Sequence, residues 1–286
     1  MNIDVKKSTF LSFLSFCNVK GKQGDGSQIE YFQSIVIEAN EGEIRCTHMH
    51  RSGNLYIDIT MAATVHTEGT ISFRVKDMVS AIEDLEGETI NVKKENLSIR
   101  AGDGNEYSFI PALDASPEQN DTYKRGLAFR PRFDWDEENI YFVLPKKIAE
   151  KNKRNENMSY KNIITTNAQD LLKKMKRLSF LDSIYYHFYT EDNKLGIELI
   201  NAKKKGRGKK FRWLNLTDVV GKFDVEFKEA IHPVINTIGS GQILIYDMND
   251  KDISNIPSVV FHEYNDVQAF YAVTQKISTN DESKKS

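Results

Sequence analysis

The sequence predicts an α+β fold that contains one structural unit twice. Most of the chain alternates apolar and polar residues as half-buried strands do, and each half also holds two short segments with helical periodicity. Residues 73–87 are similar to residues 225–239, so the two copies lie 152 residues apart. In each copy a strand leads into a short helix, which Gly87 or Gly239 is expected to close. A repeat of this length is too long for a solenoid and indicates two duplicated domains.

The first half is expected to open with a strand and a helix. Ile3 and Val5 alternate with polar residues in the strand, and Ser8 or Thr9 can cap a helix whose apolar stripe ends at Cys17. A glycine-rich loop at residues 20–27 separates this helix from runs of alternating and β-branched apolar residues. We expect strands at residues 35–37, 44–46, 55–59 and 71–75, a second helix at 78–85, and strands at 90–92, 97–99 and 107–110.

The second half repeats this order. After a strand at residues 162–165, Asn167 can cap a helix that turns Leu171, Leu172 and Met175 inward and its basic residues outward. We expect strands at 184–189, 195–200, 211–216 and 223–227, a helix at 229–238, and strands at 242–246, 258–263 and 269–274. This composition of each half is typical of an α+β domain with helices on one face of antiparallel sheet.

A long polar connector lies between the halves. Pro111 and Pro117 break the strand pattern, and the residues after them hold one strand-like piece at 140–144 and a basic stretch at 145–154 that favours a helix. A connection this long is uncommon inside a compact domain, so we expect it to have structure or function of its own. We predict an N-terminal domain at residues 1–118, a connector at 119–158, a C-terminal domain at 159–277 and a flexible tail at 278–286.

Composition and charge limit the function classes. The 286 residues are 40% hydrophobic and 28% charged with a net charge of −2, which is typical of a soluble globular chain. No apolar run is long enough for a membrane helix and no signal peptide is evident, so we expect an intracellular protein without membrane contact. Residues 146–177 hold ten basic and three acidic residues, residues 203–212 hold seven basic residues and no acids, and residues 77–88 hold five acids. Such polarity lets a near-neutral chain present one basic face to a polyanion.

Signals for catalysis, metals or cofactors are weak. Cys17 and Cys46 cannot form a disulfide framework or a complete zinc site, and Cys17 fits a core position. His48 and His50 could share a strand face as a metal pair, but no third ligand accompanies them, and a role as polar strand residues explains them better. The glycines at residues 21, 24 and 26 lack the lysine of a phosphate-binding loop. We therefore expect no catalytic residue, no metal and no cofactor.

Several segments resemble the DNA sliding clamps. The run Ile256-Pro257-Ser258-Val259-Val260 is similar to a Val-Pro-Leu-Val-Val strand of the proliferating-cell-nuclear-antigen clamps, and residues 269–277 resemble their closing Tyr-Tyr-Leu-Ala-Pro-Lys-Ile strand. Residues 107–113 resemble the corresponding point of phage-type clamps, and residues 76–87 suit the bacterial clamp pattern. The connector is longer than in those clamps, the basic hairpin at 203–212 has no counterpart, and residues 272–275 replace the Tyr-Leu-Ala-Pro ending. These departures favour a viral or divergent clamp.

The resemblance implies a ring that encloses double-stranded DNA. Two domains per chain would close a pseudo-sixfold ring from three copies, so we expect a homotrimer with head-to-tail contacts, helices around the hole and sheets outside. The implied role is that of a processivity factor without catalysis. The ring would tether a DNA polymerase and other replication proteins at high effective concentration, and a separate clamp-loader ATPase would open it.

Basic side chains around such a hole would contact phosphates, which carry no sequence information. The clearest group is Lys173, Lys174, Lys176 and Arg177, four charges beside an apolar stripe, although an ordinary solvated helix face would also explain them. The basic hairpin could reach DNA from one ring face or could act as a nuclear-localisation-like or solubilising loop. Outside the basic hairpin, we assign the expected DNA-binding residues to helices. The full set is Lys6, Lys7, Lys20, Lys22, Lys76, Lys173, Lys174, Lys176, Arg177, Lys203, Lys204, Lys205, Arg207, Lys209, Lys210 and Lys228.

A partner pocket is also implied. In the clamps that this chain resembles, polymerases and loaders insert an apolar-aromatic peptide between the connector and the C-terminal sheet, where a buried aromatic anchor carries most of the affinity. The matching positions are Leu127 and Phe129 on the connector and Pro257, Ala272 and Val273 on the sheet. Plain core packing is an equal explanation for Pro257 and Val273.

Three alternatives stay open. A clamp could serve mainly as a platform for transcription or repair, which its pulldown partners would reveal. An unrelated α+β nucleic-acid-modifying enzyme would show turnover in a nuclease assay. A monomeric module that binds single strands would differ from a trimer in its mass in solution.

Overall fold

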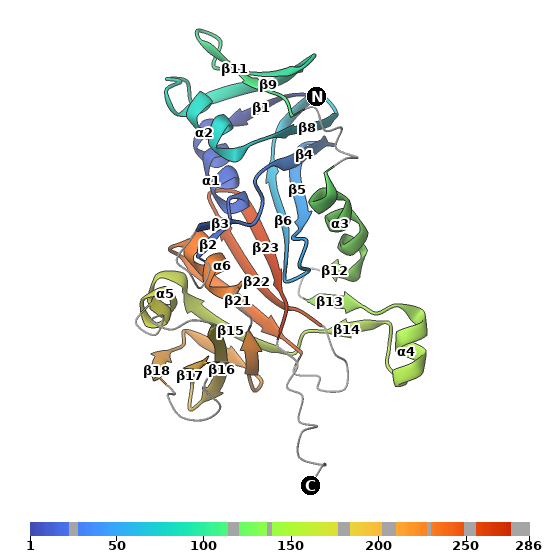
Figure 1. Ribbon diagram of the computed structural model, residues 1–286, viewed down its shortest axis with the longest axis vertical. Coiled ribbons are helices and arrows are strands. Elements are labelled where there is room, and N and C mark those ends of the chain that lie inside the picture. The colour runs from blue at the N-terminus through green and yellow to red at the C-terminus, as the bar shows by residue number, and fades with distance from the viewer. Residues whose placement is uncertain are drawn as a thin grey trace. The chain divides into compact units, whose positions relative to one another are not determined.

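The computed structural model describes residues 1–22, 28–113, 120–135, 139–176, 184–201, 210–227, 230–248 and 256–275. These residues form short helices and antiparallel sheets, so the predicted α+β class is confirmed (Figure 1). Contacts divide the chain into two compact units. The first comprises Met1–Lys22, Gln28–Pro131 and Phe261–Tyr271, and the second comprises the described residues of Arg132–Val260 and those from Ala272 onward.

The first unit is built from two sheets and a pair of helices. A five-stranded sheet has the order β11 (Tyr107–Pro111), β10 (Ser98–Gly102), β9 (Thr89–Glu95), β1 (Asn2–Lys6) and β7 (Thr64–Thr67). Further strands lie in the order β6 (Leu55–Ala62), β5 (Glu43–Met49), β4 (Ile35–Asn40) and β8 (Gly69–Phe73). Helix α1 (Lys7–Cys17) packs against helix α2 (Val75–Glu83) and against β6. Phe10, Phe13 and Leu14 of α1 are fully buried, and each contributes about 1.5–3 kcal/mol of hydrophobic stabilisation.

Residues from near the end of the chain complete the first unit. Strands β22 (Ser258–Tyr264) and β23 (Val267–Val273) contribute residues 261–271 to it, and β23 lies next to β6 in the sheet order. The buried Tyr271 hydroxyl donates to the backbone oxygen of Phe16 at 2.9 Å. Asn265 Nδ2 donates to Ser12 Oγ at 3.2 Å. The core of this unit therefore combines the two ends of the sequence.

The second unit again combines sheets with a pair of helices. A four-stranded sheet has the order β18 (Lys210–Asn215), β17 (Lys194–Asn201), β16 (Ile184–Glu191) and β20 (Asp224–Phe227). Strands β19 (Asp218–Val220), β15 (Asn162–Asn167) and β21 (Gln242–Asp247) follow one another in a second sheet, next to β22. Helix α5 (Ala168–Lys176) packs against helix α6 (Ile231–Ile238). None of the helices in the described part of the chain is long and apolar enough to cross a bilayer.

A small lobe built from the predicted connector also belongs to the second unit. Strands β12 (Phe133–Trp135), β13 (Ile140–Val143) and β14 (Asn157–Ser159) form its antiparallel sheet, and helix α4 (Lys146–Asn152) joins β13 to β14. The strand and the helix that the sequence indicated inside the connector are thereby confirmed as β13 and α4. We call these four elements the connector lobe.

The two glycines of the sequence repeat have different roles. Helix α6 is followed by Gly239, whose φ of 72° and N–H bond to the Ile235 oxygen at 3.0 Å make it a helix cap, as predicted. Helix α2 ends at Glu83 with Asp84 as its cap, so the expectation that Gly87 closes this helix is wrong. A Cβ on Gly87 would come within 2.5 Å of the Asp103 Cβ. Gly87 is therefore needed for close packing after the helix.

Two segments expected to be irregular contain regular structure. The connector begins with helix α3 (Asp121–Phe129), which is capped by the Asn120 side chain, and three residues, η2 (Arg130–Arg132), follow it as a 3-10 turn. Because α3 is short, polar and contains a glycine, its stability must come from its packing on β5 rather than from helix propensity. Within the expected glycine-rich loop, β2 (Lys20–Lys22) pairs with β3 (Gln28–Glu30). Lys20 and Lys22 therefore lie on a strand, and Lys6 is the last residue of β1, so the assignment of these three lysines to helices is wrong.

Candidate nucleic-acid interface and partner surface

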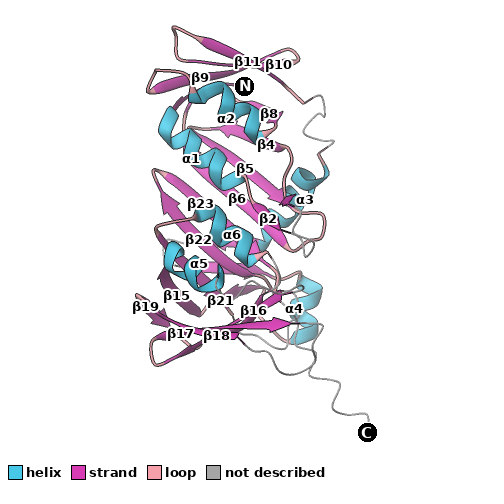
Figure 2. Cartoon of the chain, turned by 60° about the vertical axis from the view of Figure 1, so that its left-hand side comes forward, coloured by secondary structure: helices cyan, strands magenta, loops and turns pink. Residues whose placement is uncertain are grey.

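Each unit places two helices side by side (Figure 2). Candidate DNA-binding lysines lie on three of these four helices. Their charge is uneven. Helix α1 holds Lys7 and no acid, whereas α2 holds Lys76 against Asp77 and Glu83. Helix α5 holds three lysines against Asp170, and α6 holds no Asp, Glu, Lys or Arg. The basic charge of the helix pairs is therefore concentrated on α5.

Lys7 is held within the first unit. Its Nζ donates to the backbone oxygen of Glu83 at 2.7 Å and to that of Leu85, both at the C-terminal end of α2. A cation at this end of a helix complements the helix dipole and satisfies carbonyls that have no partner within the helix. Lys7 thus links α1 to α2, and it would have to give up these bonds in order to reach a phosphate.

Helix α5 has the geometry that the sequence predicted. Asn167 Oδ1 accepts the N–H groups of Gln169 at 2.9 Å and Asp170 at 3.4 Å, so the predicted cap is confirmed. Leu171 and Met175 are fully buried. Lys173 is exposed, and its Nζ lies 3.4 Å from Asp170 Oδ1. An exposed pair of this kind contributes about 0–1 kcal/mol, so Lys173 stays available to an external anion.

The other basic candidates are dispersed. Lys6 and Lys76 are exposed, and Lys20 Nζ lies 3.6 Å from Glu30 Oε1 across the β2–β3 pair. Lys22, Lys176 and Lys210 lie within described strands or helices. Seven candidates fall outside the described residues: Arg177, Lys203, Lys204, Lys205, Arg207, Lys209 and Lys228. Of the basic hairpin at 203–212, only residues 210–212, which belong to β18, are described.

The predicted partner residues occur in both units. Leu127 and Phe129 lie on α3 in the first unit, where Leu127 is exposed and the Phe129 ring packs 5.3 Å from that of Tyr56. Pro257, Ala272 and Val273 lie in the second unit, and all three are buried. The Pro257 oxygen accepts a hydrogen bond from Tyr160 Oη at 2.7 Å. A peptide site at these five positions stays a prediction.

Two edge strands offer surfaces for pairing with another chain. Strand β11 ends the five-stranded sheet of the first unit, and β18 ends the four-stranded sheet of the second. On β11, Tyr107 and Phe109 lie on the same strand face with their rings 5.4 Å apart, and they are 63% and 57% exposed. The Arg100 guanidinium lies 5.9 Å from the Tyr107 ring centre. Adjacent exposed aromatic side chains on a free sheet edge indicate an interaction surface.

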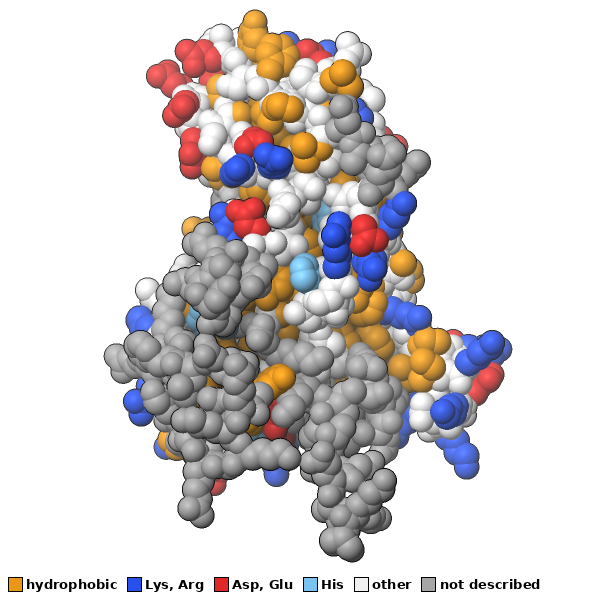
Figure 3. Space-filling view, in the orientation of Figure 1, with side chains coloured by type: hydrophobic (Ala, Val, Ile, Leu, Met, Phe, Trp, Pro, Cys, Tyr) orange, Lys and Arg blue, Asp and Glu red, His pale blue; other side chains and the backbone are white. Residues whose placement is uncertain are grey.

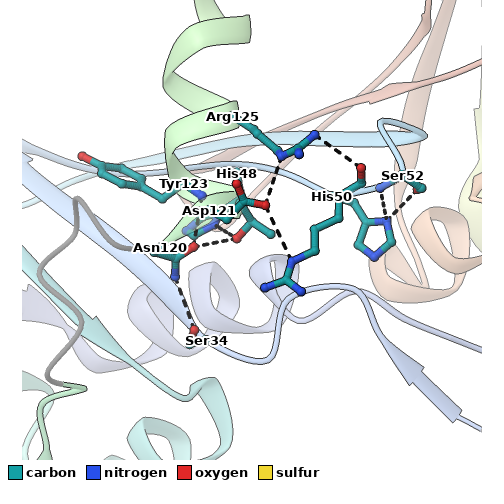
Figure 4. A network of polar contacts seen from close by, with 10 residues as sticks. Ser34, His48, His50, Ser52, Asn120, Asp121, Tyr123 and Arg125 are labelled. Atoms are coloured by element: carbon teal, nitrogen blue, oxygen red, sulfur yellow. Dashed lines mark hydrogen bonds and ion pairs between the residues drawn. The ribbon is translucent and has the colours of Figure 1, made fainter.

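A partly buried polar network that the sequence did not reveal fixes α3 to β5 (Figure 4). The Val36 N–H donates to Nε2 of the buried His48 at 2.8 Å, so Nδ1 carries the proton and donates to Thr122 Oγ1 at 2.9 Å. The Thr122 hydroxyl donates to Asn120 Oδ1 at 2.8 Å, and Asn120 Nδ2 donates to Ser34 Oγ at 3.3 Å. An unbroken chain of hydrogen bonds therefore runs from β4 through β5 to the start of α3.

Two further contacts strengthen this attachment. The Tyr123 hydroxyl donates to Glu38 of β4, and burial together with this bond raises the pKa of Tyr123. Gly126 approaches the β5 backbone so closely that a Cβ would lie 2.7 Å from the Thr47 oxygen. The Asn-Asp pair at residues 120 and 121 is the one sequence signal that could have indicated this helix start.

The network also assigns roles to the two histidines considered as a metal pair. Both ring nitrogens of His48 are engaged within the protein. His50 lies past the end of β5 and its Nδ1 is 2.7 Å from Ser52 Oγ, while burial lowers its pKa. In the part of the chain that the structure describes, no group of three or more His, Cys, Asp or Glu side chains is arranged to hold a metal ion. His48 is therefore a structural residue.

Comparisons with known proteins identify the fold. No model of a known protein family matches the chain, and no curated protein sequence matches it. Among solved structures, the PCNA2–PCNA3 complex from Sulfolobus tokodaii matches with a TM-score of 0.64 and 11% identity, over 97% of this chain and 100% of the other. PCNA from A. fulgidus, solved with the C-terminal region of FEN-1, matches with a TM-score of 0.61 and 10% identity over 97% and 99%.

A bacterial clamp matches over part of its own length. The DNA polymerase III subunit beta from Pseudomonas aeruginosa gives a TM-score of 0.62 at 16% identity, covering 96% of this chain and 66% of the bacterial one. At sequence identities of 10%, 11% and 16%, the structural similarity shows a shared fold alone. The chain has the fold of the DNA sliding clamps, and the resemblance that the sequence indicated is confirmed at that level.

Proposed function

We propose that this protein is a DNA sliding clamp that acts as a polymerase processivity factor and has no catalytic activity of its own. The observation that carries the proposal is the clamp fold over nearly the whole chain, with one helix pair in each of two units. A ring that encloses DNA holds it by topology, so a few weak phosphate contacts suffice and sliding is not hindered. The lysines of α5 are the best-placed described residues for these contacts.

We further propose that three copies close the ring. The chain matches the archaeal PCNA chains along their full length and only 66% of the bacterial beta subunit, which favours the copy number of a two-domain chain. Among the described strands, β11 and β18 each end a sheet, which supports head-to-tail closure, since an edge of one copy can pair with the edge of the next. Tyr107 and Phe109 would then become buried between copies.

The proposed partners are those of a replication clamp inside the cell. A DNA polymerase and other replication proteins would bind the ring through short peptides, and Leu127, Phe129, Pro257, Ala272 and Val273 are the proposed contact positions. One of the matching structures contains a FEN-1 peptide on its clamp, which supports this type of partner. Opening would need a clamp-loader ATPase, because ring closure gives DNA no lateral entrance.

Two measurements test the proposal. Sedimentation equilibrium should give about three times the chain mass of 32.8 kDa. In a threading assay, linear duplex DNA is fixed to beads at one end, incubated with the protein, and then blocked or left open at the other end. A ring is retained in high salt only on blocked DNA. A monomer at every concentration, or equal retention on open and blocked DNA, would overturn the proposal.

A further inference from the structure

The connector lobe carries a basic helix that the fold itself does not require. Within α4 only Ala149 is buried, and Lys146, Lys147, Ile148 and Lys151 are exposed. A helix with almost no buried face adds little to a hydrophobic core. Its sequence must therefore be explained by something other than packing.

A firm support holds this helix. Strand β13 pairs with β12 on one side and with β14 on the other, and the rings of Phe133 and Phe142 meet edge to face at 5.5 Å. The Leu144 N–H donates to the Glu156 oxygen at 2.8 Å, which closes the base of the loop that contains α4. The Tyr160 hydroxyl bond to Pro257 ties the end of the lobe to the rest of the second unit. Helix α4 is therefore presented on a sheet and not on a loose loop.

The charge of this helix is strongly one-sided. Residues 146–154 contain four lysines and one arginine against the single acid Glu150. Among the described residues, no acidic group lies within ion-pair distance of Lys146, Lys147, Lys151 or Lys153. Figure 3 shows blue basic side chains gathered over the lobe that carries α4. The charges of these four lysines are not neutralised by an ion pair within the part of the second unit that is described.

Helix stability does not explain the two lysines of the first turn. The first turn of α4 contains no acid, yet it begins with Lys146 and Lys147, whose charges oppose the positive end of the helix dipole. At the other end, Lys153 has a φ of 52°, a left-handed conformation that favours glycine, while the Arg154 N–H closes the turn on the Ala149 oxygen at 3.0 Å. Lys146 and Lys147 therefore oppose the dipole at the first turn, and Lys153 occupies a cap conformation that glycine adopts more easily, although the charges of Lys151 and Lys153 complement the C-terminal end of the helix.

We propose that the connector lobe is a DNA-contact surface, separate from the helix pairs, that binds the phosphate backbone without regard to sequence. Lys147 and Lys151 are one helical turn apart, so their Cα atoms are about 6 Å apart along the axis. Duplex DNA presents one phosphate charge for roughly every 1.7 Å of axis, so such a row meets phosphates in any register. The lobe would add electrostatic affinity that a closed ring does not supply.

The test compares three variants of the full chain with the unaltered protein. The first carries Lys146→Gln, Lys147→Gln and Lys151→Gln. The second carries arginine at the same three positions and keeps the charge. The matched control carries Lys161→Gln, Lys194→Gln and Lys222→Gln, three exposed lysines of the same unit outside the lobe. Binding to a short fluorescein-labelled duplex is followed by anisotropy over a range of potassium chloride concentrations, and circular dichroism confirms that each variant is folded.

The glutamine variant of the lobe should bind at least about tenfold more weakly at low salt, and its salt slope should fall by about 0.9 for each phosphate that the lobe no longer neutralises. The arginine variant and the matched control should keep both values. An unchanged slope, as expected if the lobe binds an acidic protein, would overturn the proposal, as would an equal loss in the control. The threading assay is independent of this result, because retention on end-blocked DNA depends on ring closure and not on the lobe.

Discussion

Replacing Gly126 by alanine tests how the connector is attached to the first unit. A Cβ at this position would lie 2.7 Å from the Thr47 oxygen and 2.8 Å from the His48 backbone nitrogen. Both contacts are with backbone atoms of β5, so the helix must move away from the strand. The 2.9 Å bond between His48 Nδ1 and Thr122 Oγ1 would then be broken or lengthened.

The expected magnitude follows from two opposing terms. Leaving a buried polar group without its partner costs about 1–3 kcal/mol. Alanine in place of glycine within a helix contributes about 1 kcal/mol in the opposite direction. We therefore expect α3 to be detached more easily by up to about 2 kcal/mol, which corresponds to an increase of up to roughly thirtyfold in its opening equilibrium.

Hydrogen exchange measured by mass spectrometry on peptides that cover α3 reports this opening directly. The control is Ala128→Gly at an exposed position of the same helix, which lowers helix propensity without touching β5. If packing dominates, both variants exchange faster in α3. If propensity dominates, Gly126→Ala exchanges more slowly than the unaltered protein, and that result would refute the reasoning.

Three further predictions concern single contacts. Lys7→Met should lower the free energy of unfolding in urea by about 1 kcal/mol, because the bonds to the α2 carbonyls are removed, while Lys6→Met should leave it unchanged. Tyr107→Lys combined with Phe109→Lys should convert the proposed trimer to folded monomers in sedimentation experiments; a persistent trimer would exclude β11 from the contact. Backbone N–H groups of Glu106, Gly87 and Asn105 lower the pKa of Asp103 to about 2, so its contribution to stability is complete above about pH 4 and is lost as the pH falls towards 2. Asp103→Asn should remove that part of the pH dependence of urea unfolding, and an unaltered profile would contradict the assignment.

Much of the architecture could be predicted because residues close together in the sequence determine it. The alternating apolar residues of the strands, the Asn167 cap and the apolar stripe of α5 each act over a few residues, and the structure confirms them. The internal repeat could be recognised for the same reason. Together with the apolar runs near the C-terminus, these local patterns are sufficient to indicate the clamp fold.

The features that the sequence did not reveal depend on distant partners. Helix α3 has polar residues and a glycine in its middle, and only its docking on β5 stabilises it. In the sequence, Lys7 resembles any surface lysine. Its role depends on backbone carbonyls at the end of α2, 76 residues away, which accept its hydrogen bonds. Gly87 resembles a helix cap, but the Asp103 side chain determines its role. In each case the deciding contact lies far along the chain.

The contribution of residues 261–271 to the first unit has a consequence for how the protein is made. The Tyr271 hydroxyl and the Phe16 carbonyl are 255 positions apart, so the ribosome must add 255 residues after Phe16 before this bond can form. Contacts of such long range slow folding, and the nascent first unit exposes apolar surface until they form. A nascent chain released before Phe261 would therefore have neither unit complete, and it should be a substrate for chaperones and proteases.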